Sequence, residues 1–217
     1  MMNVQDQYFD DVRDAVKCAR AVLGADFVSS DEIGAIRPDL GYTPQQIAKL
    51  TNTIPSKEVL YSLKKNDCVL MPHPPSARNL LAIRKTDPCH FYSSKLRAGC
   101  WYDNQEFARD DMTGNGWLMI KKVPVSGSTG KYWSEQTKLL SHAERVPNAA
   151  EMSWFITTFF AIRGIRLFED GYVRTSSRDR LGRRILVGSF DKTGLRIHFW
   201  WDTHRFGRIG LASALKV

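Results

Sequence analysis

The segment from residue 149 to residue 163 constrains the fold of this chain more than any other. Read as a helix, it is apolar on nearly every side. Its bulkiest apolar residues are Trp154, Phe155, Phe159 and Phe160. Asn148 and Glu151 have the spacing of a capping box at its start. A helix with no polar face is stable only when protein surrounds it, and this one is too short to cross a bilayer. We therefore predict that it lies at the centre of the hydrophobic core.

Three strands are predicted after this helix, at 172–176, 184–190 and 194–202. Asp191-Lys-Thr-Gly194 has the composition of a hairpin turn, so the last two strands are expected to pair in antiparallel fashion. Pairing of Phe190 with Leu195 would place Val187 opposite His198. The face of the last strand predicted to pack on the central helix consists of Leu195, Ile197, Phe199 and Trp201. The opposite, half-polar face consists of Arg196, His198, Trp200 and Asp202.

The predicted fold class is α+β, with a helical N-terminal segment (1–66) and an α+β domain (67–217) in which the central buried helix packs on a C-terminal antiparallel sheet. A capping box at Ser29 opens one helix in the first segment, and Thr43-Pro-Gln-Gln46 opens another, with Pro44 at the first helical position, where its missing N–H costs nothing. Further elements are expected at 56–66 (helix), 68–71 (strand), 117–125 (strand) and 131–144 (amphipathic helix).

The net charge of +8 is unevenly distributed along the chain. Residues 1–62 hold six basic and nine acidic side chains, whereas residues 163–217 hold twelve basic and five acidic ones. Arginine dominates the second group, and its planar guanidinium forms paired hydrogen bonds to phosphate or carboxylate. This asymmetry indicates that the C-terminal part meets an anionic partner.

The leading functional hypothesis is a non-catalytic protein that binds nucleic acid or another polyanion. The predicted contact residues are Arg174, Arg178, Arg180, Arg183, Arg184, Arg196, His198, Trp200 and Arg205. Aromatic rings beside arginines offer surfaces on which bases stack. One alternative is that the arginines only pair with Asp170, Asp179, Asp191 and Asp202 on a solvated face. Another is an assembly component whose basic face meets an acidic protein partner.

A third hypothesis is an enzyme acting on a phosphorylated or nucleic-acid substrate, with His198 and nearby arginines in the site. His198 and Asp202 are four residues apart, which on a strand separates them by about 13 Å. No set of nucleophile, base and orienting group is visible, so the catalytic residues stay unknown. Phosphate-loop, dinucleotide, G-x-S-x-G and H-E-x-x-H motifs are absent from the sequence, which removes the usual support for ATP hydrolysis, dinucleotide redox chemistry and zincin proteolysis.

Neither a cofactor nor a metal ion is predicted. A zinc site would have to draw on Cys68, His73, Cys89, His90 and Cys100, whose spacing is irregular and contains no C-x-x-C pair. Buried, reduced thiols explain the cysteines more simply. The first 14 residues carry four aspartates and lack the pattern of a signal peptide, so a cytoplasmic location and no membrane partner are expected.

Overall fold

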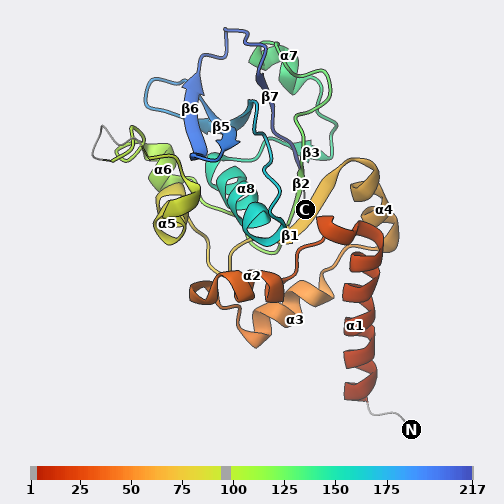
Figure 1. Ribbon diagram of the computed structural model, residues 1–217. Helices are drawn as coiled ribbons and strands as arrows, with labels where there is room; N and C mark the ends of the chain where they lie inside the picture. Colours follow the sequence, from red (N-terminus) through yellow and green to blue (C-terminus); the bar gives the residue numbers. More distant parts are fainter. Residues whose placement is uncertain (1–3, 94–98, 217) are drawn as a thin grey trace.

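The computed structural model describes residues 4–93 and 99–216, with side chains from Asp14 onward. It confirms the α+β class: helices surround two four-stranded sheets (Figure 1). Most of the aspartates on which the expected cytoplasmic location rests lie in the first 13 positions. The structure does not describe the side chains of those positions.

The elements follow one another as a helical N-terminal third, a mixed middle and a strand-rich end. The α-helices are α1 (Val4–Leu23), α2 (Ser30–Ile36), α3 (Pro44–Asn52), α4 (Lys57–Lys65), α5 (Leu80–Thr86), α6 (Glu106–Asp110), α7 (Trp133–Thr137) and α8 (Ala149–Arg163). Three 3-10 turns, η1 (Gly24–Asp26), η2 (Pro38–Leu40) and η3 (Pro88–His90), join some of them. The strands are β1 (Cys68–Pro72), β2 (Trp117–Lys121), β3 (Glu144–Arg145), β4 (Tyr172–Arg178), β5 (Arg184–Asp191), β6 (Gly194–Trp200), β7 (Ile209–Leu211) and β8 (Ala214–Leu215).

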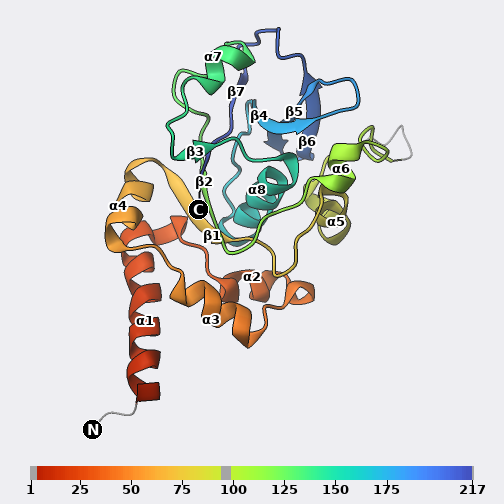
Figure 2. The same ribbon diagram turned by 180° about the vertical axis from the view of Figure 1, so that it is seen from behind.

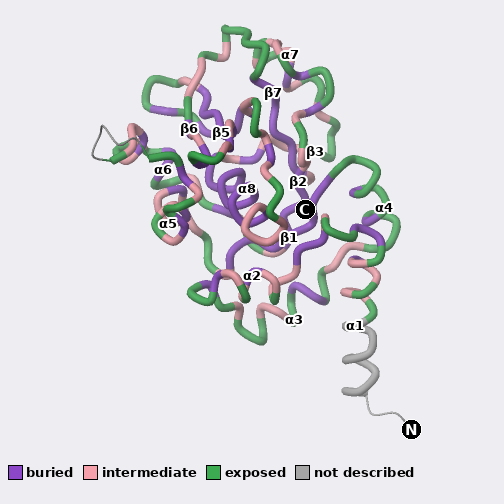
Figure 3. Tube along the Cα trace, viewed as in Figure 1, coloured by how far each residue is buried: buried purple, intermediate pink, exposed green. Residues whose placement is uncertain are grey.

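Helix α8 is the centre of the molecule, as predicted. Every residue from Ala149 to Phe159 is buried, and the trace in Figure 3 is purple along this stretch. The capping box of Asn148 and Glu151 is present. The Trp154 indole donates to the carbonyl of Pro72 at the end of β1, so the one polar atom of this large side chain is satisfied inside the core.

The second sheet has the order β6-β5-β4-β7, and its first three strands are antiparallel. Strand β7 adds to β4 in parallel, which the sequence reasoning did not anticipate. The predicted register is right only at the turn, where Asp191 pairs with Gly194. A bulge at Ser189, whose φ is +45°, shifts the rest by one residue, so Val187 faces Ile197 and not His198.

The prediction that Trp201 belongs to the core is wrong. Strand β6 ends at Trp200, so the alternation that would turn Trp201 inward stops one residue earlier, and Trp201 is 47% exposed. Ile197 and Phe199 do lie against the core. The helix-on-sheet packing therefore holds without Trp201.

The first sheet has the order β1-β2-β8-β3, and only β1 and β2 were predicted from the sequence. Strands β3 and β8 have two residues each, too few to leave an alternating pattern. The helix predicted at 131–144 is also wrong, because α7 spans only 133–137. Gln136 turns inward and donates to the carbonyls of Ser128 and Ile209, whereas the apolar Leu139 is exposed.

The N-terminal helices begin where their caps predict. The capping boxes at Ser29 and Thr43 are both formed. The boundary predicted at 66/67 falls between α4 and β1, and both sides contribute to one apolar cluster, in which Leu60 and Leu63 pack with Leu70. Within the described part of the chain, no helix is long and apolar enough to span a membrane.

His73, directly after β1, gives the fold a measurable pH dependence. It is buried, with Nε2 3.9 Å from a Glu151 oxygen that Arg145 also holds. Burial lowers the pKa of His73 from 6.5 to about 4. The unfolded chain therefore binds a proton that the folded chain excludes, and stability falls as the pH drops from 6.5 toward 4.

We expect the free energy of unfolding to decrease by about 2 kcal/mol between pH 7 and pH 5, measured by urea denaturation. His73→Gln should remove most of this decrease, and exposed His142→Gln should leave it unchanged. The carboxyl groups of Glu32 and Glu144, with pKa lowered to about 2, act mainly below pH 4.5. If the free energy of unfolding of His73→Gln falls as much between pH 7 and pH 5 as that of the unaltered protein, His73 is not the cause of the pH dependence.

Candidate nucleic-acid interface

Most of the predicted contact residues belong to one end of the second sheet, whereas Arg196 lies toward the opposite end, beside the β5–β6 turn. The connection between β6 and β7 (201–208) runs along the top of the molecule toward α7, and the turn between β4 and β5 (179–183) projects sideways at the upper left of Figure 1 and the upper right of Figure 2. The structure divides the predicted residues into two groups, those beneath this surface and those on it.

Arg174 lies beneath the surface and is fully buried, so it is not a contact residue. One Nη donates to the carbonyl of Lys131 at 2.9 Å and to Gln136 Oε1 at 2.8 Å. The other donates to the carbonyls of Trp201 and His204, at 3.3 and 2.7 Å. Burial lowers the pKa of this guanidinium. Arg174 thus joins the β6–β7 connection to the segment that enters α7.

Arg184 is buried as well, and its assignment to the interface is likewise corrected. Its Nε and Nη2 donate to Asp202 at 3.2 and 3.0 Å, and its guanidinium lies 3.6 Å from the Trp133 ring centroid. Both side chains leave β4 or β5 toward the 131–136 and 201–204 segments. Those segments are distant in sequence from the two arginines. The alternation of residues along the strands therefore could not show that Arg174 and Arg184 are covered.

The other arginines reach the surface, most of them with a carboxylate partner. Arg183 pairs with Asp179 at 2.6 Å and lies over Phe199, and Arg196 pairs with Asp191 at 2.8 Å. Arg178 is more exposed and binds Asp202 at 2.7 Å. The side chain of Arg205 is 55% exposed, 3.5 Å from Glu135.

The carboxylates do not balance the cations. Asp179, Asp191 and Asp202 pair as the solvated-face alternative expects, whereas Asp170 forms no ion pair with a described residue. Residues 172–217 contain ten basic and only three acidic side chains. The exposed cations of this segment left with no carboxylate partner in the described part are Arg180, Lys192, Arg208 and Lys216.

Aromatic rings lie among these cations. Trp201 and Phe206 are 47% and 48% exposed, and Tyr132 is exposed with Arg205 4.1 Å above its ring. Trp200 is half-buried, 5.7 Å from Phe206 between ring centroids. Trp201 and Tyr132 were missing from the predicted site, because Trp201 was assigned to the core and Tyr132 to a helix whose exposed side the sequence did not identify.

We call the exposed part of this region the arginine–aromatic surface. It consists of Tyr132, Arg178, Arg180, Trp201, Arg205 and Phe206.

His198 lies apart from an acid–base partner. Its Nδ1 accepts from the backbone N–H of Phe199 at 2.8 Å. It lines a hollow of about 290 Å³ together with Tyr92, Gly99, Cys100, Trp101, Tyr102, Arg196, Ile197 and Phe199. None of these described lining residues carries a carboxylate, and Asp202 is already bound to Arg178 and Arg184. The geometry therefore gives no support to catalysis by His198 and Asp202.

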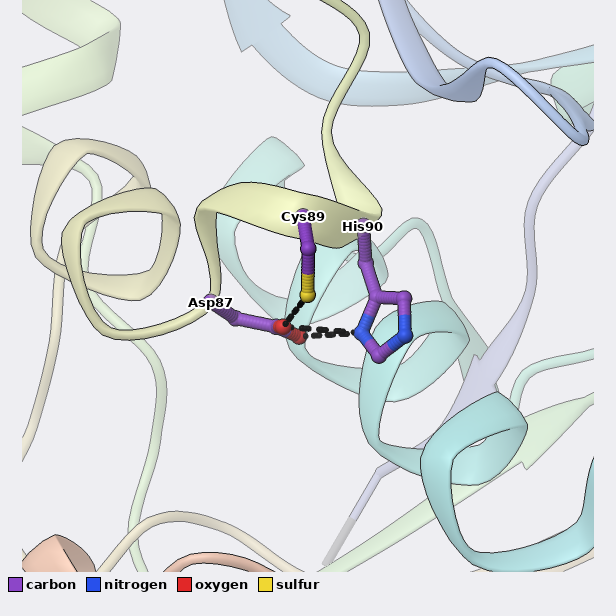
Figure 4. Close-up of side chains that lie close together, drawn as sticks. All are labelled: Asp87, Cys89 and His90. Atoms are coloured by element: carbon purple, nitrogen blue, oxygen red, sulfur yellow. Dashed lines mark hydrogen bonds and ion pairs between the residues drawn. The ribbon is translucent and has the colours of Figure 1, made fainter.

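Of the residues considered for zinc, only Cys89 and His90 come together in the described part. They join Asp87 at η3, with one possible ligand atom from each residue and all three atoms within 4.8 Å of one another (Figure 4). Cys68 is buried in β1, in the apolar cluster that contains Leu63 and Leu70. The four cysteines are free thiols, but of the expected buried positions only Cys68 is buried: Cys18 and Cys100 are partly exposed and Cys89 is exposed.

No protein-family model, curated protein or solved structure matches this chain.

The buried role of Arg174 can be tested by removing its hydrogen bonds. Arg174→Met should lower the free energy of unfolding by about 2–4 kcal/mol, because three carbonyls and Gln136 lose their donor. Hydrogen exchange at residues 201–206 should accelerate. Arg180→Met, which also removes one arginine charge but from the exposed turn, should change stability by less than about 0.5 kcal/mol. Equal stability of the two variants would contradict the role given to Arg174.

Proposed function

We propose that this protein binds single-stranded nucleic acid through the arginine–aromatic surface. The observation that carries the proposal is the β6–β7 connection, in which Trp201, Arg205 and Phe206 are exposed while the buried Arg174 holds its backbone from below.

Unpaired positive charge supports a polyanion as the partner. On this surface Arg180 has no carboxylate partner among the described residues, and Asp202 is shared by Arg178 and the buried Arg184. Phosphate oxygens can replace the exposed Glu135 carboxylate as the acceptor for Arg205, and they can add to Asp202 as acceptors for Arg178. Each phosphate contact releases a counterion, so affinity should fall steeply with salt.

The exposed rings favour single strands over duplexes. Trp201 and Phe206 are about half exposed, which leaves ring faces free for unpaired bases. Stacking on such faces contributes about 1–3 kcal/mol per base and tolerates any sequence. Bases inside a duplex are already stacked and cannot use these rings.

The connection is held in place before any ligand arrives. Arg174 binds the carbonyls of Trp201 and His204, and the carbonyl of Asp202 accepts from the Trp133 N–H at 3.1 Å. The Asp202 side chain is fixed by Arg178 and Arg184. A preordered loop loses less conformational entropy on binding, which favours affinity.

An acidic protein partner is the competing interpretation. Tryptophan, tyrosine and arginine are also the residues that dominate protein–protein contacts, and all three occur on this surface. The experiment below separates the two partners, because a nucleic acid offers bases to the rings and an acidic polypeptide does not.

The test is fluorescence anisotropy with labelled single-stranded and double-stranded DNA and RNA over a salt series. Binding should be stronger for single strands and should weaken with salt. Trp201→Ala/Phe206→Ala should reduce the affinity by about 5- to 150-fold per stacked base with little change in the salt dependence. Arg180→Ala/Arg205→Ala should lower the slope of log K against log salt by about one per lost phosphate contact.

The matched control is Lys64→Ala/Lys65→Ala, which removes two positive charges from α4, away from this surface (Figure 1). It should bind like the unaltered protein. A folded protein that binds no strand at low salt would refute the proposal. Polyglutamate is the second probe. Equal affinity for polyglutamate and single strands, insensitive to Trp201→Ala/Phe206→Ala, would refute it in favour of an acidic protein partner.

A further inference from the structure

The 3-10 turn η3 gathers three metal-ligating side chains at a place unrelated to the arginine–aromatic surface. His90 Nδ1 lies 2.8 Å from Asp87 Oδ1, and Cys89 Sγ lies 3.5 Å from the same oxygen (Figure 4). The tight turn at Pro88–His90 brings side chains from consecutive positions onto one side of the backbone. Adjacent residues of a strand would point apart.

Asp87 is positioned by a partner that leaves one of its oxygens accessible to the cluster. Arg37, at the end of α2, forms a buried ion pair with Asp87 Oδ2 and also donates to the carbonyl of Thr86 at 3.2 Å. His90 Nδ1 lies between the two carboxylate oxygens, 2.8 Å from Oδ1 and 2.9 Å from Oδ2, and Oδ1 also faces the Cys89 sulfur. Ligating carboxylates are typically held in this way by a hydrogen bond to their second oxygen.

The distances suit a tetrahedral ion. With zinc–sulfur bonds of about 2.3 Å and zinc–oxygen bonds of about 2.0 Å, a tetrahedron places its sulfur and oxygen about 3.5 Å apart. The Cys89–Asp87 distance is 3.5 Å. The expected oxygen–nitrogen distance is about 3.3 Å. The observed 2.8 Å therefore requires the His90 ring to move by only a few tenths of an ångström.

We propose that Asp87, Cys89 and His90 bind one Zn²⁺ ion. Thiolate and imidazole ligands select zinc over magnesium or calcium, which prefer sets of oxygen ligands. Binding releases the Cys89 thiol proton to solvent. The metal takes the place of the proton at His90 Nδ1, and the neutral ring carries its proton on Nε2. Cys89 is exposed and His90 is 24% exposed, so water fills the fourth position.

The test uses Co²⁺ as a spectroscopic probe for Zn²⁺, on the full chain after treatment with a chelator. Titration should produce visible bands of tetrahedral Co²⁺ and a near-ultraviolet thiolate-to-cobalt band, saturating at one ion per chain. Zn²⁺ should abolish both. Cys89→Ser should lose the thiolate band, and His90→Gln should weaken the affinity by at least about tenfold.

Cys18→Ser removes a thiol from α1 and serves as the matched control, with an unchanged spectrum expected. Circular dichroism shows whether each variant is folded. Asp87 is left unaltered, because its loss would leave Arg37 buried without a partner. A folded protein without cobalt bands, or a thiolate band that persists in Cys89→Ser, would overturn the proposal.

Discussion

The burial of α8 is the constraint on which the rest of the structure depends. A helix with apolar side chains on every side must be enclosed, and here elements from the whole chain enclose it: β4 and β5 of the second sheet, α2, α5 and α6, with the end of β1 bound to Trp154. Ala149 is anchored through its N–H to the Ser177 hydroxyl on β4. The second sheet therefore has one face committed to the core, and its loops at one end are left to form a surface.

Arginine has two physical roles in this sheet, and composition does not separate them. Arg174 and Arg184 are buried, where a guanidinium can satisfy several backbone carbonyls and a carboxylate together. A lysine could not span the same acceptors, because it offers one point of charge. Arg178 and Arg205, nearby in space, keep their side chains in solvent. A run of arginines in a sequence can therefore indicate buried side chains that anchor a loop as well as a charged surface.

Local signals in the sequence predicted local structure, and longer-range packing accounts for the errors. The capping boxes at Thr43 and Asn148 and the turn at Asp191–Gly194 depend on residues within four positions, and all formed. The hairpin register failed because a bulge at Ser189 leaves no mark in an alternating pattern. The exposed cations of the candidate site were predicted, but Trp201 and Tyr132 were not. Whether Trp201 is covered depends on where β6 ends and on segments distant in the sequence.

The allocation of carboxylates connects the two proposals. In the C-terminal part, three aspartates meet ten basic side chains, so positive charge is left over at the surface and calls for anions from outside. At η3 the situation differs: Arg37 already balances the charge of the Asp87 carboxylate, and what remains is an oxygen, a nitrogen and a sulfur donor close together. Unbalanced arginines can be neutralised by phosphate, whereas an oxygen beside nitrogen and sulfur donors can bind a metal ion. The first proposed ligand therefore follows from charge that the neighbouring carboxylates leave uncompensated, and the second follows from the donor atoms that a carboxylate held by Arg37 presents.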